Sequence, residues 1–361
     1  MTTKRILGLF LVFLFSLSLF AGFAEALPAR QRGPQMKQPP AQERVTVPKE
    51  IKAVLQEGLI SRQGRQDIPF DIFQSLTFPA RENLYPVFLF KAKNADLGFV
   101  PSADPAQPGL EARLNAFVQF LQEDGSGVPQ VRLELYLPLA VQAESEGYDP
   151  EKAEWYSFGM AMLPGNYTLA LAITSPDLQK VGVDYLDFVL PDPAAFQEAL
   201  ETTPIFFAKG MNQMEAVEQR PIIHKGMFTY ANLQIEPYID NIVPAGEMIE
   251  LLFYIFGTKL KDTEAGMRPE NDIEISFEVN KDDDSLPAEE RIAVRWEPQK
   301  YNFALISQPL PLKQTVVITN EKGDQSTEQR DLEAGKYILD VKIKDNISGL
   351  TLDKAIPFEV K

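Results

Sequence analysis

Cysteine is absent from the 361-residue chain, and histidine occurs only once, at position 224. The missing thiols exclude disulfides, thiolate metal sites and thiol catalysis. A single histidine cannot form a multi-histidine metal centre, and the chain has no G-x-S-x-G elbow to complete a serine triad. Dinucleotide and phosphate-binding glycine motifs are missing as well. We therefore expect no enzyme and no cofactor, and we interpret His224 as a structural or surface residue.

Positive charge is scarce relative to negative charge. The chain has 35 Lys and Arg against 51 Asp and Glu, which gives a formal net charge of −16. Such a surface repels nucleic acid and anionic lipid, so neither is an expected partner. The acidic residues are spread along the chain rather than collected in a tail, a pattern typical of a solvated surface.

Long apolar runs are missing except near the start. Lys4 and Arg5 precede an apolar run over Ile6–Ala21, and Ala24-Glu25-Ala26 follows with the small-x-small pattern of a cleavage site. These features predict a signal peptide over residues 1–26 and export to the periplasm or the outside. After cleavage, no remaining apolar run is long enough to span a membrane.

The segment between the signal peptide and the first strands has little capacity to form a core. Residues 27–47 are rich in Pro, Gln and Arg, so we expect a disordered leader. Over residues 48–80 we expect a short helix followed by an irregular, proline-containing wrap. The helix would have one apolar face packed on the first domain, made of Ile51, Val54, Leu55 and Leu59.

The rest of the chain has the pattern of antiparallel strands. From Val131 to Leu137 apolar and polar residues alternate, and Val181–Leu190 is a second clear strand candidate. Short strands separated by turns favour sandwiches over βαβ units. We predict an all-β protein with two immunoglobulin-like antiparallel β-sandwich domains in tandem. The first covers residues 81–191, a helical connector covers 192–203, and the second covers 204–361.

One phrase occurs twice in the chain. Residues 162–175 read MLPGNYTLALAITS, and residues 332–345 read LEAGKYILDVKIKD. At a constant offset of 170 residues, a domain-scale spacing, several residue types coincide. The matching pairs include Gly165 with Gly335, Tyr167 with Tyr337, Leu169 with Leu339, and Phe188 with Phe358.

Immunoglobulin-like sandwiches place a tyrosine near the start of strand F, where its hydroxyl ties down the neighbouring corner. The phrase around Tyr167 and Tyr337 resembles such a strand, with leucine in place of the core cysteine. It is similar to the immunoglobulin-like and fibronectin-type modules found in tandem in exported bacterial proteins. PAGEMIELLFYIFG at 244–257 also resembles the C-terminal sandwich regions of GWxTD-type proteins, although the GWxTD motif itself is absent. The resemblance implies a structural or adhesive role.

The sharpest acidic cluster is NKDDDS at 280–285, in which Asn280, Asp282 and Asp284 have the alternate spacing of Ca²⁺ ligands. Ser285 stands where an EF-hand loop needs glycine, and Arg291 stands where it needs the closing glutamate. We therefore favour a solvated turn over a metal site.

Three large aromatic residues, Trp155, Tyr156 and Trp296, have the ring size to stack on sugars. Packing in a core or between sheets is the competing interpretation, and the one we favour.

Three functions follow in order of preference. The first is a non-catalytic exported protein that binds or spaces other proteins of the bacterial cell envelope. The second is a carbohydrate-binding accessory protein, with envelope polysaccharide as partner. The third is a two-domain periplasmic chaperone, which would offer an exposed strand edge to its clients.

Overall fold

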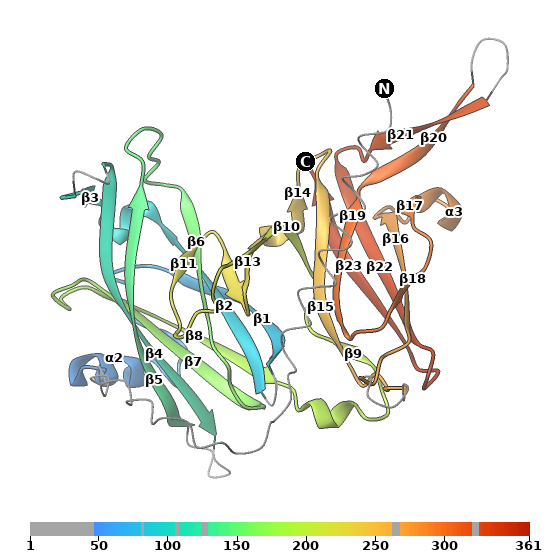
Figure 1. The fold of residues 1–361 in the computed structure, drawn as a ribbon. Helices are drawn as coiled ribbons and strands as arrows, with labels where there is room; N and C mark the ends of the chain where they lie inside the picture. The colour runs from blue at the N-terminus through green and yellow to red at the C-terminus, as the bar shows by residue number, and fades with distance from the viewer. Residues whose placement is uncertain (1–46, 81–82, 105–107, 124–128, 262–267, 320–324) are drawn as a thin grey trace. The chain divides into compact units, whose positions relative to one another are not determined.

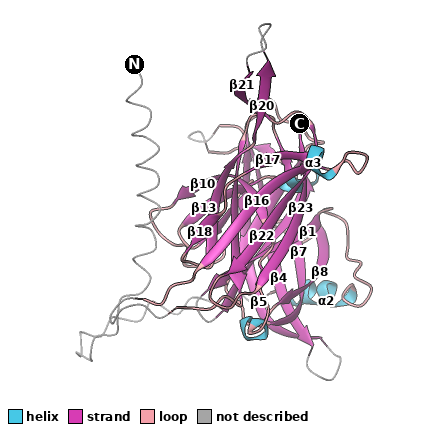
Figure 2. Cartoon of the chain, turned by 90° about the vertical axis from the view of Figure 1, so that its right-hand side faces the viewer, coloured by secondary structure: helices cyan, strands magenta, loops and turns pink. Residues whose placement is uncertain are grey.

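The computed structural model describes residues 47–80, 83–104, 108–123, 129–261, 268–319 and 325–361. Val45–Lys361 forms one compact unit. Figure 1 shows that it consists mainly of strands, and in Figure 2 only short helices interrupt them. The predicted all-β class is confirmed. The predicted signal peptide and nearly all of the leader lie outside the described residues.

Two sheets enclose the first hydrophobic core, and all strand pairs within them are antiparallel. Their facing side chains include Phe88, Phe120 and Leu169, all fully buried. Sheet 1 contains β3 (Val100–Pro101), β4 (Leu110–Glu123), β5 (Pro129–Ala143), β7 (Gly165–Thr174) and β8 (Val181–Leu190). Sheet 2 contains β1 (Asp71–Ala80), β2 (Asn83–Lys93), β6 (Ala153–Gly159) and β11 (His224–Lys225).

Two further sheets enclose a second core, in which Phe253, Phe277 and Leu339 are fully buried. Sheet 3 contains β9 (Glu201–Thr202), β10 (Phe206–Gln213), β12 (Phe228–Tyr230), β13 (Leu233–Pro237), β15 (Met248–Phe256) and β19 (Leu305–Pro311). Sheet 4 contains β14 (Ile242–Val243), β16 (Ile273–Lys281), β17 (Ile292–Arg295), β18 (Gln299–Tyr301), β22 (Gly335–Asp345) and β23 (Thr351–Val360). The hairpin of β20 (Lys313–Thr319) and β21 (Gln325–Asp331) forms a separate sheet.

A third apolar cluster joins sheet 2 to sheet 3, and we call it the interlayer cluster. Because each of these sheets is covered on both faces, consecutive residues of their strands are buried, as at Val87 and Phe88. This explains the uninterrupted apolar runs of β2 and β15, which differ from the alternation of a half-exposed strand. The buried members of the interlayer cluster are Leu76, Phe78, Val87, Leu89, Phe206, Ala208, Phe228, Ile235 and Leu252.

Helix α2 (Lys49–Glu57) lies on the face of sheet 1 that points away from the first core. Ile51 and Leu55 are almost completely buried there, in contact with a cluster that includes Phe117 and Val183. The remaining helices are short. They are η2 (Asn94–Leu97), η3 (Pro193–Phe196), η4 (Ile239–Asn241) and α3 (Ala288–Arg291).

The structure corrects the expected irregular wrap, because residues 71–80 form strand β1. The aromatic residues and prolines there suggested irregular chain, but β1 is an edge strand paired only with β2 among the described strands. Edge strands tolerate proline. Alternate side chains of β1 enter the interlayer cluster, which supplies the burial that stabilises the strand.

The connector at 192–203 contains the expected helical turn. Asp192 accepts a hydrogen bond from the Ala194 N–H at 2.9 Å and caps η3. The boundary at 204 is crossed, however, because β11 comes after it and pairs with β6 of sheet 2. The short β11 gave no signal of its own in the sequence.

The repeated phrase forms the same local structure twice. The Tyr167 hydroxyl donates a 3.0 Å hydrogen bond to the Leu163 carbonyl, and the Tyr337 hydroxyl donates a 3.0 Å hydrogen bond to the Glu333 carbonyl. Each tyrosine stacks on the phenylalanine opposite it in the next strand, with ring centroids 5.5 Å and 5.6 Å apart. Gly165 and Gly335 lie at the first positions of β7 and β22.

Candidate functional site

The acidic cluster after β16 does not gather ligands around one point. The Asn280 side-chain amide donates a 2.7 Å hydrogen bond to Asp340, and Asp284 pairs with Arg291 at 3.0 Å. The main-chain N–H of Asp282 donates a hydrogen bond to the Lys336 carbonyl. Within the described ranges, no group of three or more acidic or histidine side chains has a metal-binding arrangement.

The three candidate stacking residues lie against apolar clusters. Tyr156 is fully buried, its ring stacks on Phe90 at 5.3 Å, and burial raises the pKa of its hydroxyl. Trp155 is half-buried against the interlayer cluster, and Trp296 is half-buried against the second core. All three are thus at least half-buried, which favours the packing interpretation over sugar stacking.

His224 is half-buried where β11 meets β6. Its Nε2 lies 3.0 Å from the Glu218 carboxylate, which also accepts a 3.0 Å hydrogen bond from Thr229. These contacts tie β11 to the loop that contains Glu218 and to Thr229 of β12.

A groove of about 250 Å³ lies between β1 of sheet 2 and β8 of sheet 1. It follows the open side of the first sandwich, where the two sheets end in β1 and β8. The connector and the end of β15 close one end. The lining residues are Ser75, Thr77, Asp187, Phe188, Val189, Pro191, Thr202, Thr203, Pro204 and Phe256.

The wall formed by β1 offers unpaired main-chain groups. On the neighbouring strand, the Pro86 carbonyl accepts from the Met160 N–H, so the main chain at Pro86 faces away from β1. Thr77 lies opposite Pro86, and Ser75 lies opposite Phe88. Because antiparallel pairs alternate, the N–H and C=O groups of Thr77 and Ser75 point away from β2 toward the free edge.

The opposite wall, formed by β8, is covered over only part of its length. The segment at 65–67 pairs with its beginning, where Asp67 donates to the Val181 carbonyl and Val183 donates to the Arg65 carbonyl. By the same alternation, the N–H and C=O groups of Asp187 and Val189 also point away from sheet 1. No described strand pairs with this part of the edge.

Side chains add further hydrogen-bonding capacity to the groove. In the part of the chain that the structure describes, the hydroxyls of Ser75, Thr77 and Thr202 have no protein hydrogen-bond partner. Val189 is 65% exposed and supplies an apolar contact at the rim. The groove can therefore satisfy main-chain donors and acceptors of a bound molecule on both walls.

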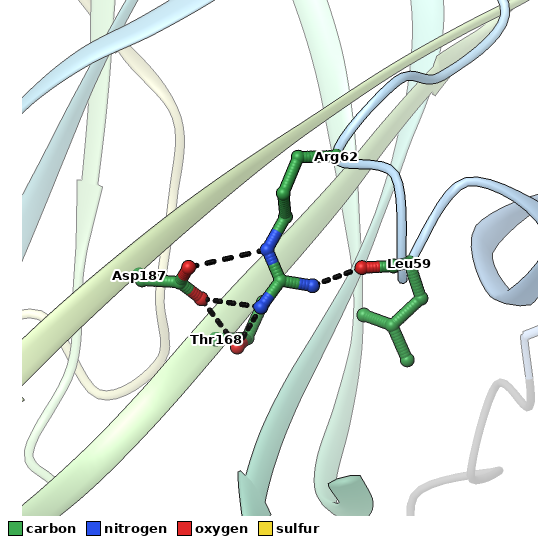
Figure 3. Close-up of polar contacts among 4 residues, drawn as sticks. All are labelled: Leu59, Arg62, Thr168 and Asp187. Atoms are coloured by element: carbon green, nitrogen blue, oxygen red, sulfur yellow. Dashed lines mark hydrogen bonds and ion pairs between the residues drawn. The ribbon is translucent and has the colours of Figure 1, made fainter.

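Figure 3 shows how the β8 wall is fixed to the segment after α2. The Arg62 guanidinium donates to both carboxylate oxygens of Asp187, at 3.1 and 2.8 Å, and to the Thr168 hydroxyl. It also donates to the Leu59 carbonyl. Burial alone would raise the pKa of Asp187, but hydrogen bonds from Thr168 and Arg62 and the charge of Arg62 outweigh it and lower this pKa. Asp187 is thus held as a carboxylate in a fixed position.

No protein-family model matches the chain, and a search of curated proteins finds no match either. The geometry of the molecule is therefore the basis for its function. The groove residues gave no signal in the sequence, because edge status is a property of the assembled sheets. The one related feature of the sequence is Val189, an apolar residue at a position of an amphipathic strand that the structure shows to be exposed.

Among the described residues, no helix has the length and apolar character needed to cross a membrane.

Proposed function

We propose that this chain is a non-catalytic protein-binding component that holds an extended segment of a partner chain in the groove between β1 and β8. The observation that supports this most directly is the pair of free strand edges on opposite walls, at Thr77 and Val189. Adding a strand to an exposed sheet edge is a common mode of peptide recognition.

The partner segment would extend sheet 1 by pairing with β8. Main-chain groups of Asp187 and Val189 would bond to the segment, and the hydroxyls of Ser75 and Thr77 would contact it from the other wall. The net charge of −16 favours a segment with basic side chains, because opposite potentials speed association.

The opposite edge of sheet 1 is less suited to the same role. β5 carries Pro138 in its middle, opposite Asn115 of β4. Proline has no N–H to donate and is one of the features that protect natural edges from pairing. The β8 edge contains no proline between Val181 and Leu190.

The architecture and cellular setting belong to the same proposal. Two immunoglobulin-like sandwiches with paired tyrosine corners at Tyr167 and Tyr337 suit a structural or adhesive component of tandem type. The expected signal peptide at 1–26 would bring the protein to the periplasm or the outside, where its partners would be envelope proteins.

A selection from a displayed library of random peptides tests the proposal. Val189→Pro removes the outward N–H at the groove, and Ala140→Pro is the matched control. Ala140 is exposed on the β5 edge, two residues from the natural Pro138, so its N–H points outward as well. Peptides selected on the full-length chain should bind Val189→Pro at least about tenfold more weakly and bind Ala140→Pro unchanged.

Equal binding of the selected peptides to the parent chain and to Val189→Pro would overturn the proposal. Recovery of no peptide above a blank selection would do the same. Loss of binding in Ala140→Pro alone would move the site to the β5 edge and would also overturn it.

A further inference from the structure

The hairpin of β20 and β21 pairs with none of the four other sheets that the described residues form, although β20 lies close to β17 of sheet 4. Figure 1 shows it extending beyond the end of the strands around it. Its base is anchored by Leu312 and Leu332, both buried in the second core. Every side chain of β21 is exposed. Isolated two-stranded hairpins are marginally stable in water, so a partner strand would stabilise this one.

The hydrogen-bond register identifies which groups of β20 are unpaired. At the base, the Leu332 N–H donates to the Leu312 carbonyl at 3.0 Å, which fixes these residues as a hydrogen-bonded pair. Positions in β20 therefore alternate, and the main-chain groups of Thr315 and Val317 point away from β21. A free edge with donors and acceptors runs along β20.

The two edges of the hairpin differ in charge. β21 carries Glu328, Arg330 and Asp331, whereas β20 has no charged residue between Gln314 and Ile318. Natural proteins protect exposed edges with charged side chains, and β20 has this protection only at its first residue, Lys313. Val317 is 58% exposed in the middle of this uncharged stretch.

We propose that β20 pairs with β20 of a second copy of this chain, antiparallel and around a twofold axis at Val317. Outward-pointing positions must face each other across such a pair, so Val317 meets its own copy and Val316 meets Ile318 of the second copy. Pairs of β-branched residues are favourable across antiparallel strands, and no like charges are opposed between Gln314 and Ile318. The result is a four-stranded sheet with an isologous interface.

The contact is small, which sets its expected strength. With the axis at Val317, residues 315–319 of each β20 overlap, and a strand pair of this length buries less than the roughly 1,200–2,000 Å² of a stable interface. We therefore expect reversible, concentration-dependent dimers. The groove between β1 and β8 takes no part in this contact, so the inference does not depend on the proposed function.

The absence of cysteine makes site-directed crosslinking a direct test. Val317→Cys places one thiol at the twofold axis. Thr327→Cys is the matched control, because Thr327 lies directly across the hairpin from Val317 and is also exposed. With a short bismaleimide reagent, Val317→Cys should give dimers whose yield rises with protein concentration, and Thr327→Cys should remain monomeric.

Sedimentation velocity over a concentration series gives a second readout without a reagent. The parent chain should associate, Val317→Lys should weaken association at least about tenfold because two lysines would then face each other, and Thr327→Lys should leave it unchanged. A parent chain that stays monomeric throughout would overturn the proposal. So would equal crosslinking of the two cysteine variants, or equal effects of the two lysine variants.

Discussion

Phe78 of β1 stacks on Tyr230 of β12 with ring centroids 4.5 Å apart, and the Tyr230 hydroxyl donates a 2.7 Å hydrogen bond to the Pro79 carbonyl. The two residues belong to different sandwiches and are separated by about half of the described chain. Their contact lies in the interlayer cluster, where Phe78 also touches Phe206 and Phe228. The two sandwiches therefore share one apolar cluster, and we expect them to unfold together.

Removing the ring of Phe78 should destabilise the whole unit. We expect Phe78→Ala to lower the free energy of unfolding by about 3–5 kcal/mol, because it leaves a cavity among fully buried aromatic side chains. Denaturant unfolding followed by circular dichroism measures this. Ile60→Ala is the control and should change stability by less than about 0.5 kcal/mol, since Ile60 is 96% exposed. A loss below about 1 kcal/mol in Phe78→Ala would contradict the shared-core interpretation.

The tyrosine corners should contribute equally. Tyr167→Phe and Tyr337→Phe each remove one hydroxyl that donates to a carbonyl four residues upstream at 3.0 Å. Each change should cost about 1 kcal/mol of unfolding free energy. Because the corners share no partner, the double variant should show the sum of the two effects within about 0.5 kcal/mol. Tyr148→Phe, at a half-buried ring outside the corners, should be close to neutral.

Two carboxyl groups of β8 should respond to pH in opposite directions. Burial raises the pKa of Asp184, although its hydrogen bond from the Ile72 N–H works against the shift. A raised pKa in the folded state means that ionisation of Asp184 weakens the fold as pH rises. Asp184→Asn should therefore be more stable than the parent chain at neutral pH, and the gain should vanish below the unfolded pKa of about 4.

Asp187 provides the matched comparison on the same strand. Its pKa is lowered, so its carboxylate contributes stability above the unfolded pKa and loses it as pH falls through the folded pKa. Asp187→Asn should cost about 0.5–1 kcal/mol at neutral pH and nothing in strong acid, a modest effect because Asp187 is largely exposed. Unfolding measured from neutral to acid pH tests both variants. If Asp184→Asn and Asp187→Asn changed the free energy of unfolding at neutral pH in the same direction, the opposite pKa shifts assigned to the two carboxyl groups would be contradicted.

A fragment that ends in the connector should fail to fold on its own. Residues 1–203 lack β11 and the side chains of sheet 3, among them Phe206 and Phe228, that cover Leu76, Phe78 and Val87. We expect such a fragment to aggregate and to bind a hydrophobic dye, because an apolar face of this size promotes association. A soluble fragment with a cooperative unfolding transition would show that the first sandwich is independent. The full-length chain, prepared in parallel, is the control.

The sequence predicted the elements whose side chains face one core. Val181–Leu190 has the same bounds as β8, and the echo around Tyr167 and Tyr337 identifies two strands with matching register. The short helix at 49–57 also follows from its apolar face. In these elements local pattern and tertiary burial agree, which is the condition under which sequence reasoning succeeds.

The remaining features depend on relations between distant segments. The sequence of β1 suggested irregular chain because its side chains enter two different cores and because it contains proline. Strand β11 gave no pattern because it has only two residues. The candidate groove was not predictable for a related reason. Whether the main chain of Thr77 or Val189 is paired depends on which strands end each sheet, and no local pattern records that.

The crossing strand β11 also sets an order of events during synthesis. The ribosome delivers β1, β2 and β6 first, but the strand that completes their sheet emerges only with His224 and Lys225. Between those moments the nascent chain carries an unfinished sheet and an uncovered apolar face. Folding of the first half therefore waits until part of the second half has emerged, and any pause in translation before codon 224 would prolong the period in which aggregation competes with folding.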